Sequence, residues 1–501
     1  MEIATLLPAD VIGVHVPTDL FIGGVWRASS SAETFDVVDP RTEQRVASVA
    51  DAEVADAMLA LDAADAAQAA WAATTPRHRA SILQRAFDVI NARADDVASV
   101  ITAETGKPLP EARGEVTYGA EFLRWYAEQA AHPRGEYGSA PSGDVRIVTT
   151  RVPVGPSLLI TPWNFPLAMG TRKVGAALAA GCTIILKPAE QTPLTAALLV
   201  DVLREAGVPD GVVNFVPTSN AAAQSAALMN DQRLRKVSFT GSTPVGTTLL
   251  RQAADNVMRS SMELGGNGPF LVLADADIDA AVDGAMLAKF RNGGQSCVAA
   301  NRFIVHRSIA DRFTAALAER TASLRTIVES GEPDVGPLID ARQRARVQEL
   351  VADAVDRGAR ALCGGTAPSA PGYFYAPTVL ADVPADARIL HEEIFGPVAP
   401  ITVVDSNDQA IALANDTPYG LAAFLFTRDV TRAFALAERL EAGMVGINRG
   451  LVSEVAAPFG GIKASGIGRE GGSSGIEEYL ETKYYSLDMS PTRSANEGVR
   501  R

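Results

Sequence analysis

The chain has 501 residues, of which 47% are hydrophobic and 21% are charged, and this length allows two or three domains with sizeable cores. Its formal net charge of -14 argues against nucleic acid and anionic membranes as partners, because neither surface attracts an acidic protein. Its three cysteines are too few and too scattered for a disulfide framework or a zinc site, and they suit a reducing compartment.

The sequence gives no sign of a targeting or membrane-spanning segment. Residues 1–19 carry acids without an initial positive cluster, unlike a secretory signal. No uninterrupted apolar run approaches the roughly 18 residues that a membrane span needs. We therefore expect a cytoplasmic protein.

The first half of the chain predicts an α/β fold. Apolar residues at helical spacing predict helices over 53–72 and 77–105. From Val154 onward, short apolar runs alternate with helical segments. The expected strands are 158–160, 183–186, 212–216 and 237–239, and the expected crossover helices are 168–180, 193–206, 220–229 and 245–257. This alternation predicts a parallel sheet in a doubly wound, nucleotide-binding domain.

A second series of strands and helices begins near Phe270, after an expected domain boundary near Gly265. Its expected strands lie around Phe303, Ile401 and Phe424 and over 444–448. Residues 132–153 contain Pro, Gly and Ser and then a stretch in which apolar and polar residues alternate, which is typical of a β-hairpin. Residues 480–487 could supply a partner strand. Because unpaired edge strands invite pairing, we expect this arm to join subunits. The tail from Ser490 is polar, and we expect it to be loose.

Cys297 lies at a glycine-led turn between an expected helix over 277–290 and an expected strand over 302–306. The glycines Gly293 and Gly294 let the backbone approach a substrate closely, and a backbone N–H beside a thiolate can donate to an oxyanion. A free cysteine is often only a small buried hydrophobe. This stretch alone leaves the nucleophile and core interpretations open.

Two pattern matches near the end of the chain do not carry chemistry. Gly466 to Gly471 fit G-x-G-x-x-G, but too little chain follows for the βαβ unit that the motif requires. Gly471 to Gly475 fit the hydrolase pattern G-x-S-x-G. Its triad order requires a downstream histidine, and all five histidines precede it.

The stretch from Ser238 to Gly246 stands where a strand gives way to a helix, so the first N–H groups of that helix form an anion site. Gly241 and Gly246 have the spacing of a phosphate-binding loop, but the lysine of that motif is missing. Without this lysine, the stretch favours binding of a pyrophosphate that does not react over phosphoryl transfer. The alternative is that Ser242 only caps the helix.

Three further stretches offer polar groups, two of them at the ends of expected strands and one, with Glu263, at the expected domain boundary. Lys187 and Glu190 can hydrogen-bond ribose hydroxyls, or form a solvated charge pair. Asn164, in a loop stiffened by two prolines, offers an amide donor for an oxyanion, or supports a proline turn. Glu263 could act as a general base, or be an ordinary solvated carboxylate.

Together, the order and spacing of these five motifs resemble the aldehyde dehydrogenase superfamily from about residue 20 to residue 488. The resemblance implies a Rossmann-like parallel-sheet NAD-binding domain, an α/β catalytic domain and a β oligomerisation arm. It assigns 1–131 and 154–264 to the dinucleotide-binding domain and 265–479 to the catalytic domain. The arm and the C-terminal tail then comprise 132–153 and 480–501. It also implies a homodimer or homotetramer.

The resemblance also implies the roles of single residues. Cys297 attacks the aldehyde, Glu263 activates water, and Asn164 with the Cys297 N–H holds the oxyanion, and no metal is needed. The implied cofactor site comprises Trp163, Lys187, Pro188, Ala189, Glu190, Thr240, Gly241, Ser242, Gly246, Leu264, Glu393 and Phe395. Because the Glu190 carboxylate would repel a 2′-phosphate, we expect NAD to be preferred over NADP.

Within the superfamily, the stretches 169–173, 289–302 and 457–471 make the chain most similar to the succinate-semialdehyde dehydrogenases. This resemblance implies that Arg172, Arg291 and Ser453 hold the far carboxylate of the substrate. Ala299 stands where several relatives carry a second cysteine, and Gly170 stands where a larger apolar residue is common. The alternatives are another aldehyde, such as glutarate semialdehyde or a simple aliphatic or aromatic one, and a non-catalytic structural relative.

Overall fold

The computed structural model describes residues 9–132, 135–328 and 331–489. Its largest sheet has eight strands in the order β23-β13-β12-β9-β10-β11-β3-β4. Five of them run parallel, namely β9 (Ser157–Ile160), β10 (Ile184–Lys187), β11 (Val213–Phe215), β12 (Lys236–Thr240) and β13 (Arg259–Glu263). The other three are β3 (Leu20–Ile22), β4 (Val25–Arg27) and β23 (Gly466–Ile467). The expected parallel sheet is confirmed.

Crossover helices connect the five parallel strands. They are α5 (Pro166–Ala180), α6 (Pro193–Glu205), α7 (Ala221–Asn230) and α8 (Thr243–Asp255), and each overlaps an expected helix. A proline in the first turn of α5, α6 and α8 lacks only an N–H that would be unpaired there anyway. The connections place all five carboxyl ends at one edge, and the strand order changes direction between β9 and β12. Ligands of doubly wound sheets bind at such a point.

The amino-terminal helices depart from the expectation in two ways. After α1 (Val54–Ala72), the single helix expected over 77–105 is wrong, because α2 (Pro76–Ala92) and α3 (Ala94–Thr105) are separate. Arg93 between them leaves the helical conformation, with φ -110° and ψ 22°. The long helix α4 (Leu109–Ala130) was not expected at all.

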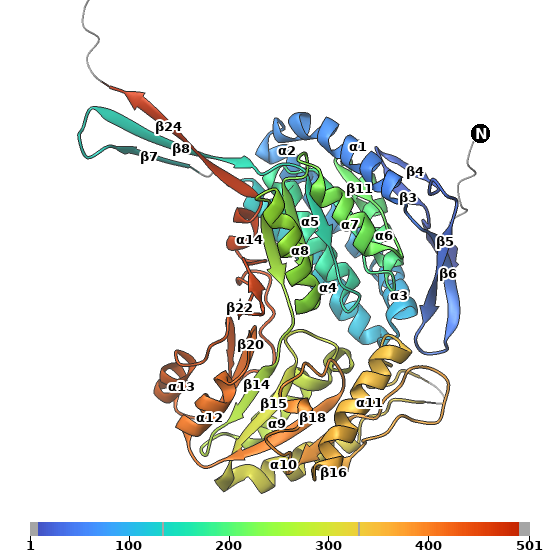
Figure 1. The fold of residues 1–501 in the computed structure, drawn as a ribbon, viewed down its shortest axis with the longest axis vertical. Helices are drawn as coiled ribbons and strands as arrows, with labels where there is room; N and C mark the ends of the chain where they lie inside the picture. The colour runs from blue at the N-terminus through green and yellow to red at the C-terminus, as the bar shows by residue number, and fades with distance from the viewer. Residues whose placement is uncertain (1–8, 133–134, 329–330, 490–501) are drawn as a thin grey trace, which may run out of the picture.

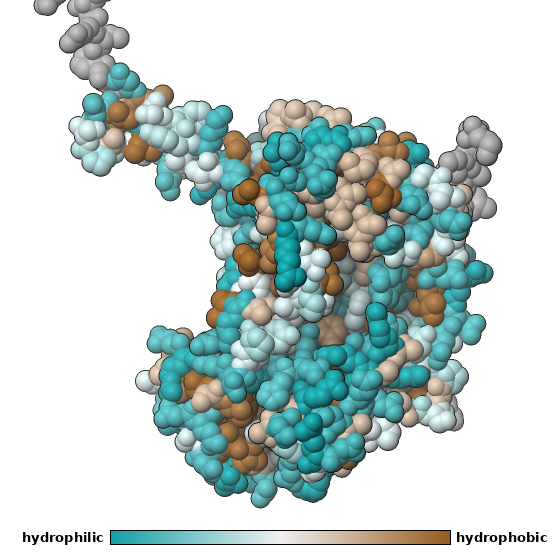
Figure 2. Space-filling model, in the orientation of Figure 1, coloured by the Kyte–Doolittle hydropathy of each residue, from teal (hydrophilic) through white to brown (hydrophobic). Residues whose placement is uncertain are grey.

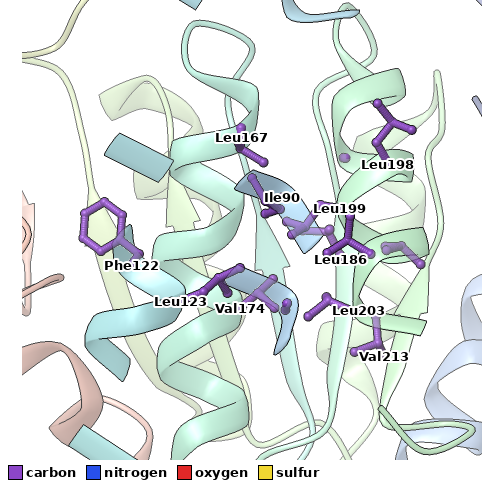
Figure 3. Close-up of a cluster of buried hydrophobic side chains, with 14 of the residues drawn as sticks. Ile90, Phe122, Leu123, Leu167, Val174, Leu186, Leu198, Leu199, Leu203 and Val213 are labelled. Carbon is purple, nitrogen blue, oxygen red and sulfur yellow. The ribbon is translucent and has the colours of Figure 1, made fainter. Parts of the chain in front are cut away.

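The core of this region packs α4 firmly against α5. Leu123 of α4 and Val174 of α5 meet Ile90, Leu186 and Leu203 from neighbouring elements, as Figure 3 shows, and none of these side chains is solvent-exposed. Burial of such a side chain contributes about 1.5 to 3 kcal/mol. The cluster thereby holds α4 at a fixed place beside the sheet.

A second sheet of seven strands has the order β16-β17-β18-β15-β14-β20-β21 and lies in the lower part of Figure 1. Its strands are β14 (Gly268–Val272), β15 (Ala300–His306), β16 (Arg360–Cys363), β17 (Thr378–Ala381), β18 (Val398–Val404), β20 (Ala422–Phe426) and β21 (Met444–Ile447). Its helices are α9 (Ile278–Phe290), α10 (Arg307–Ala322), α11 (Ala341–Asp356), α12 (Asn407–Asn415) and α13 (Val430–Ala437). The strands expected in this region all occur.

The arm is a three-stranded antiparallel sheet that projects from the body in Figure 1. It consists of β7 (Gly135–Ser139), β8 (Val145–Pro153) and β24 (Leu480–Asp488), so the partner strand expected over 480–487 pairs as expected. Tyr137, Tyr484 and Leu487 are exposed on it, and Figure 2 shows apolar side chains along it. The tail from Ser490 lies outside the described residues.

The remaining elements are short. They are the pairs β1 (Ala9–Val11) with β2 (Val14–Val16), β5 (Thr34–Asp39) with β6 (Gln44–Ala50) and β19 (Tyr419–Gly420) with β22 (Ile462–Lys463), and the helix α14 (Ser474–Glu477). Among the helices that the structure describes, none combines the length and the apolar composition needed to cross a bilayer.

Candidate active site

A cavity of about 590 Å³ opens at the carboxyl edge of the first sheet. The segments that follow β9 and β12 line one side of it, and the loop that carries Cys297 lines another. Most of the expected site residues line it, namely Trp163, Asn164, Arg172, Thr240, Gly241, Ser242, Leu264, Arg291, Cys297, Glu393, Phe395 and Ser453. The other expected site residues lie outside its lining, namely Glu263, Lys187, Pro188, Ala189, Glu190 and Gly246. The fold thus brings residues from distant parts of the sequence to one place.

Cys297 sits on a loop whose backbone only small or turn-forming residues can adopt. After α9, a short 3₁₀ turn (Arg291–Gly294) passes through the left-handed region at Asn292 and Gly293, with φ of 54° and 60°. Asn and Gly tolerate this conformation best. A Cβ on Gly294 would clash with the Gly396 carbonyl, and one on Gly266 with the Cys297 carbonyl. These glycines let neighbouring backbone segments pack against the thiol loop.

Burial raises the pKa of the Cys297 thiol to about 12, and the charges of Glu393 and Glu263 add to this shift while Arg172 opposes it. The side chain is nevertheless only half-buried, because it faces the cavity. The thiolate is the reactive form of cysteine. Without ligands, the site therefore holds its sulfur mainly as the thiol at neutral pH.

Asn164 extends from the loop between β9 and α5 toward the thiol loop. Its Nδ2 donates a hydrogen bond of 3.0 Å to the carbonyl of Gln295, two residues before Cys297. Its Oδ1 accepts from the Phe165 N–H at 3.1 Å. Because an amide nitrogen carries two hydrogens, the second can donate to a substrate oxygen. The geometry suits the oxyanion donor that the sequence predicts.

Glu263 ends β13 and is 3% exposed. Burial, and then the charge of Glu470, raise the pKa of its carboxyl well above the usual range. Its Oε2 has no hydrogen-bond partner among the described residues. A buried carboxyl with an unpaired oxygen and an electrostatic link to Cys297 has the properties of a general base.

The segment that the sequence predicts as an anion site forms the start of α8. Ser242 is its N-cap residue but makes no side-chain cap bond, so the first N–H groups of α8 keep their capacity for an anion. Thr240, Gly241 and Ser242 line the cavity at the point where the strand order reverses. This arrangement fits a dinucleotide pyrophosphate. Gly246 serves packing instead, because a Cβ there would clash with Leu264.

Lys187 and Glu190 follow β10, the strand beside β9. Lys187 is 4% exposed, and burial lowers the pKa of its ammonium group, whereas Glu190 is exposed. On the opposite wall, Glu393 accepts a 3.0 Å hydrogen bond from the Gly266 N–H, and burial raises its pKa to about 7. The ring of Phe395 meets the Trp163 ring edge to face at 5.3 Å. Trp163, Glu393 and Phe395 thus line the cavity, whereas Lys187 and Glu190 lie outside its lining.

A model of the aldehyde dehydrogenase family matches residues 26–485. The chain belongs to this family. A succinate-semialdehyde dehydrogenase of Paenarthrobacter nicotinovorans is 55% identical over 444 residues, covering 88% of this chain and 98% of that protein. A glutarate-semialdehyde dehydrogenase of Pseudomonas aeruginosa is 46% identical, covering 93% of this chain and 97% of that protein. The crystal structure of an NADP dependent enzyme of E. coli is similar with a TM-score of 0.92 and 45% identity, covering 94% of this chain and 98% of that chain.

In this aldehyde dehydrogenase the two arginines expected to hold the substrate differ in their surroundings. Arg172 is buried, lies 3.4 Å from a carboxylate oxygen of Glu470 and donates to the Tyr118 hydroxyl at 2.9 Å. Its guanidinium also stands 4.1 Å from the centre of the Phe459 ring. Arg172 is therefore already paired with an internal carboxylate, so its buried charge is balanced without a substrate anion.

Arg291 lies in different surroundings. It is partly exposed at the cavity wall, 5.0 Å from the centre of the Phe165 ring, and forms no ion pair with any residue that the structure describes. A second cavity of about 260 Å³ shares Arg291 and Ser453 with the first. In this dehydrogenase, Arg291 is thus the arginine with free capacity for an incoming carboxylate.

Sequence reasoning missed the buried cluster beneath Glu263. Glu470 bonds both Arg172 and Lys173. Burial raises the pKa of Glu470, and Lys173 and Arg172 more than reverse this shift, so it lies below its usual range. Glu470 stands inside the glycine-rich pattern that was set aside as a decoy, and Gly466 within that pattern forms the edge strand β23 beside β13. The sequence signal that could have pointed to Glu470 is an acidic residue between glycines in a motif that had no assigned role.

Proposed function

We propose that this enzyme oxidises succinate semialdehyde to succinate. The observation that carries this proposal is the unpaired Arg291 in the same cavity as the Cys297 thiol, because a cation there can bind a carboxylate at the far end of a short aldehyde. The similarity to a succinate-semialdehyde dehydrogenase at 55% identity supports the same substrate.

Different residues of the chain carry out the separate steps of the reaction. The Cys297 thiol loses its proton to solvent and its sulfur attacks the aldehyde carbon. The carbonyl oxygen of the adduct becomes an oxyanion, which accepts hydrogen bonds from the Asn164 amide and the Cys297 N–H. Such donors contribute about 10² to 10³ each in rate. When bound, NAD(P) supplies the hydride acceptor. Glu263 then takes a proton from the water that hydrolyses the Cys297 thioester, which releases the acid and restores the thiol.

The first prediction concerns Arg291. We expect the Arg291→Ala variant to raise the KM for succinate semialdehyde about ten- to a hundredfold, because hydrogen bonds to a charged group contribute about 1.5 to 3 kcal/mol. Steady-state kinetics with succinate semialdehyde and butyraldehyde measures the effect. Butyraldehyde lacks the carboxylate and serves as the matched control, so its kcat/KM should stay unchanged. Equal efficiency of the wild type with both aldehydes would refute the semialdehyde assignment.

Glutarate semialdehyde is the second candidate substrate. The adjoining cavity of about 260 Å³ extends beyond Arg291, so a substrate one methylene longer has room there. The 46% identity to a glutarate-semialdehyde dehydrogenase points the same way. Including this aldehyde in the same kinetic series decides between them by the ratio of kcat/KM values.

For the cofactor we propose a preference for NAD over NADP. The exposed Glu190 follows β10, and its carboxylate would accept hydrogen bonds from a free ribose 2′-hydroxyl but repel a 2′-phosphate. A similar E. coli enzyme is NADP dependent, so the preference needs a direct test. We expect higher kcat/KM with NAD, and we expect Glu190→Ser to narrow the difference. Equal efficiency with both cofactors in the wild type would contradict the proposal.

We also propose that the arm joins copies of this chain into a homodimer or homotetramer. The outer edge of β24 is exposed over most of its length and carries apolar side chains. An edge of this kind favours pairing with another strand. We expect light scattering on the purified protein to give a mass of two or four chains of 52.5 kDa. The mass of a single chain would contradict the assignment.

A further inference from the structure

Two loops have to be aligned for the oxyanion to be held. One follows β9 and carries Asn164, and the other follows α9 and carries Cys297. They come from different sheets, so neither sheet alone sets the distance between them. Both loops, however, contact one helix, α4, through carboxylates one turn apart at Glu111 and Glu115.

The first of these contacts fixes the Asn164 loop. Glu115 accepts hydrogen bonds at 2.9 and 3.3 Å from the Leu167 and Ala168 N–H groups, in the first turn of α5. Its other oxygen lies 2.5 Å from the Lys107 ammonium group. Lys107 in turn donates to the backbone carbonyl of Asn164 at 2.9 Å. Both charged side chains are almost fully buried, so their geometry is held tightly.

The second contact fixes the thiol loop. Glu111 accepts from the Asn292 N–H at 3.0 and 3.1 Å. The Asn292 side chain then donates at 3.0 Å both to the Asn164 carbonyl and to the Gln295 carbonyl. The Asn164 carbonyl thus receives bonds from Lys107 and Asn292 together. It is the point at which the two loops are joined.

We propose that Lys107 and Glu115 are positioning residues for the oxyanion donor, and that they act by holding the Asn164 backbone in register with the Cys297 loop. This inference rests on the proposed role of Asn164. The pair does not reach the reacting atoms, because its bonds end on the Asn164 carbonyl and on the N-terminus of α5. Its effect should therefore pass through the Asn164 side chain.

The test uses a charge-neutral pair variant, Lys107→Met with Glu115→Gln, in the full-length enzyme. The glutamine keeps an oxygen for the α5 N–H groups, and removing both charges avoids an unpaired buried ion. We expect kcat for butyraldehyde to fall at least tenfold with KM changed less than about twofold, because loss of an oxyanion donor costs about 10² to 10³ in kcat. Butyraldehyde is the substrate for this test because Lys107 and Glu115 also line the cavity of about 260 Å³ beside Arg291, where a substrate carboxylate could reach them. Alkylation of Cys297 by iodoacetamide should keep its wild-type rate, because that reaction forms no oxyanion.

The decisive measurement is a double-mutant cycle with Asn164→Ala. Groups that act through Asn164 lose their effect once its amide is gone, so the pair variant should cost nothing further in that background. Independent, multiplying losses would overturn the inference. If Asn164→Ala itself leaves kcat unchanged, the proposed role of Asn164 fails, and the inference fails with it.

Asp56→Asn is the matched control for general destabilisation. Asp56 is a fully buried carboxylate in the first turn of α1 that accepts from the Ser30 and Glu53 N–H groups. We expect it to lower the melting temperature without changing kcat. Should the pair variant not fold, Lys107→Arg keeps the cation beside Glu115 but replaces the compact ammonium group. It should show a smaller kcat loss that is again absent in the Asn164→Ala background, and an unchanged kcat would refute the inference.

Discussion

The Cys297→Ser variant is expected to lose aldehyde oxidation entirely while it still binds NAD(P). A serine hydroxyl in the same buried position cannot supply a nucleophile of comparable reactivity, whereas the cofactor-facing wall of the cavity stays unchanged. Aldehyde-dependent growth of absorbance at the NADH wavelength measures turnover, and calorimetric titration measures cofactor binding. Retained turnover in the variant would refute the mechanism, and an inactive wild type would instead favour a non-catalytic relative.

The reactivity of the same thiol should depend steeply on pH. Because burial raises its pKa to about 12, the thiolate fraction should grow about tenfold per pH unit over the range from 7 to 10. Iodoacetamide alkylation without cofactor, followed by mass spectrometry, measures this dependence. A Cys363→Ser background removes the other half-buried thiol, and Cys182 is buried. An alkylation rate that levels off near pH 8 would show that the thiol is activated at rest.

Glu263→Gln should still produce one equivalent of reduced cofactor and then stall. The glutamine cannot take a proton from water, so the Cys297 thioester should accumulate, and steady-state turnover should fall about 10² to 10⁴-fold. Rapid-mixing absorbance measures the burst, and intact-protein mass spectrometry measures the acyl-enzyme.

The wild type supplies the control for this assignment. Since the pKa of Glu263 is raised, the carboxylate fraction that can act as a base increases with pH, and thioester hydrolysis should accelerate accordingly. The variant should lack this pH dependence. Undiminished turnover in Glu263→Gln, or the absence of both burst and acyl-enzyme, would show that Glu263 does not act as the base in thioester hydrolysis.

Much of the parallel sheet could be predicted from the sequence because its strands are short runs of apolar residues buried on both faces. β13 was missed, since its residues Arg259–Glu263 contain no such run. The helix α4 was missed as well, although Ala112, Val116, Leu123 and Ala127 stand at helical spacing, because Gly114 and Gly119 weaken the local helix signal. The break at Arg93 has neither Gly nor Pro. The sequence signal for it is the pair Asp95 and Asp96, which are acidic residues in the first turn of α3.

Asn164, Lys187 and Thr240 could be proposed because each stands at or just after the end of an expected strand, and parallel strands share one carboxyl edge. Cys297 could be proposed from its glycine-led turn between an expected helix and an expected strand.

The partners of the site residues could not be proposed. Glu470 lies almost three hundred positions from Arg172 in the sequence, and only the folded chain shows that it neutralises this arginine and leaves Arg291 free. Lys107 and Glu115 were likewise invisible, because a buried lysine or glutamate in a sequence looks like any solvated one.

The last part of the chain completes the site that the earlier parts outline. β23 pairs Gly466 with Glu263, and Glu470 neutralises Arg172 and Lys173, so a chain still being synthesised that ends before residue 470 would leave two buried cations without their carboxylate. Such a state is strongly unfavourable. Translation therefore makes the helices and the nucleotide-type sheet first, and the catalytic centre can settle only once synthesis is almost complete. An incomplete chain released by premature termination would be inactive and a substrate for cellular quality control.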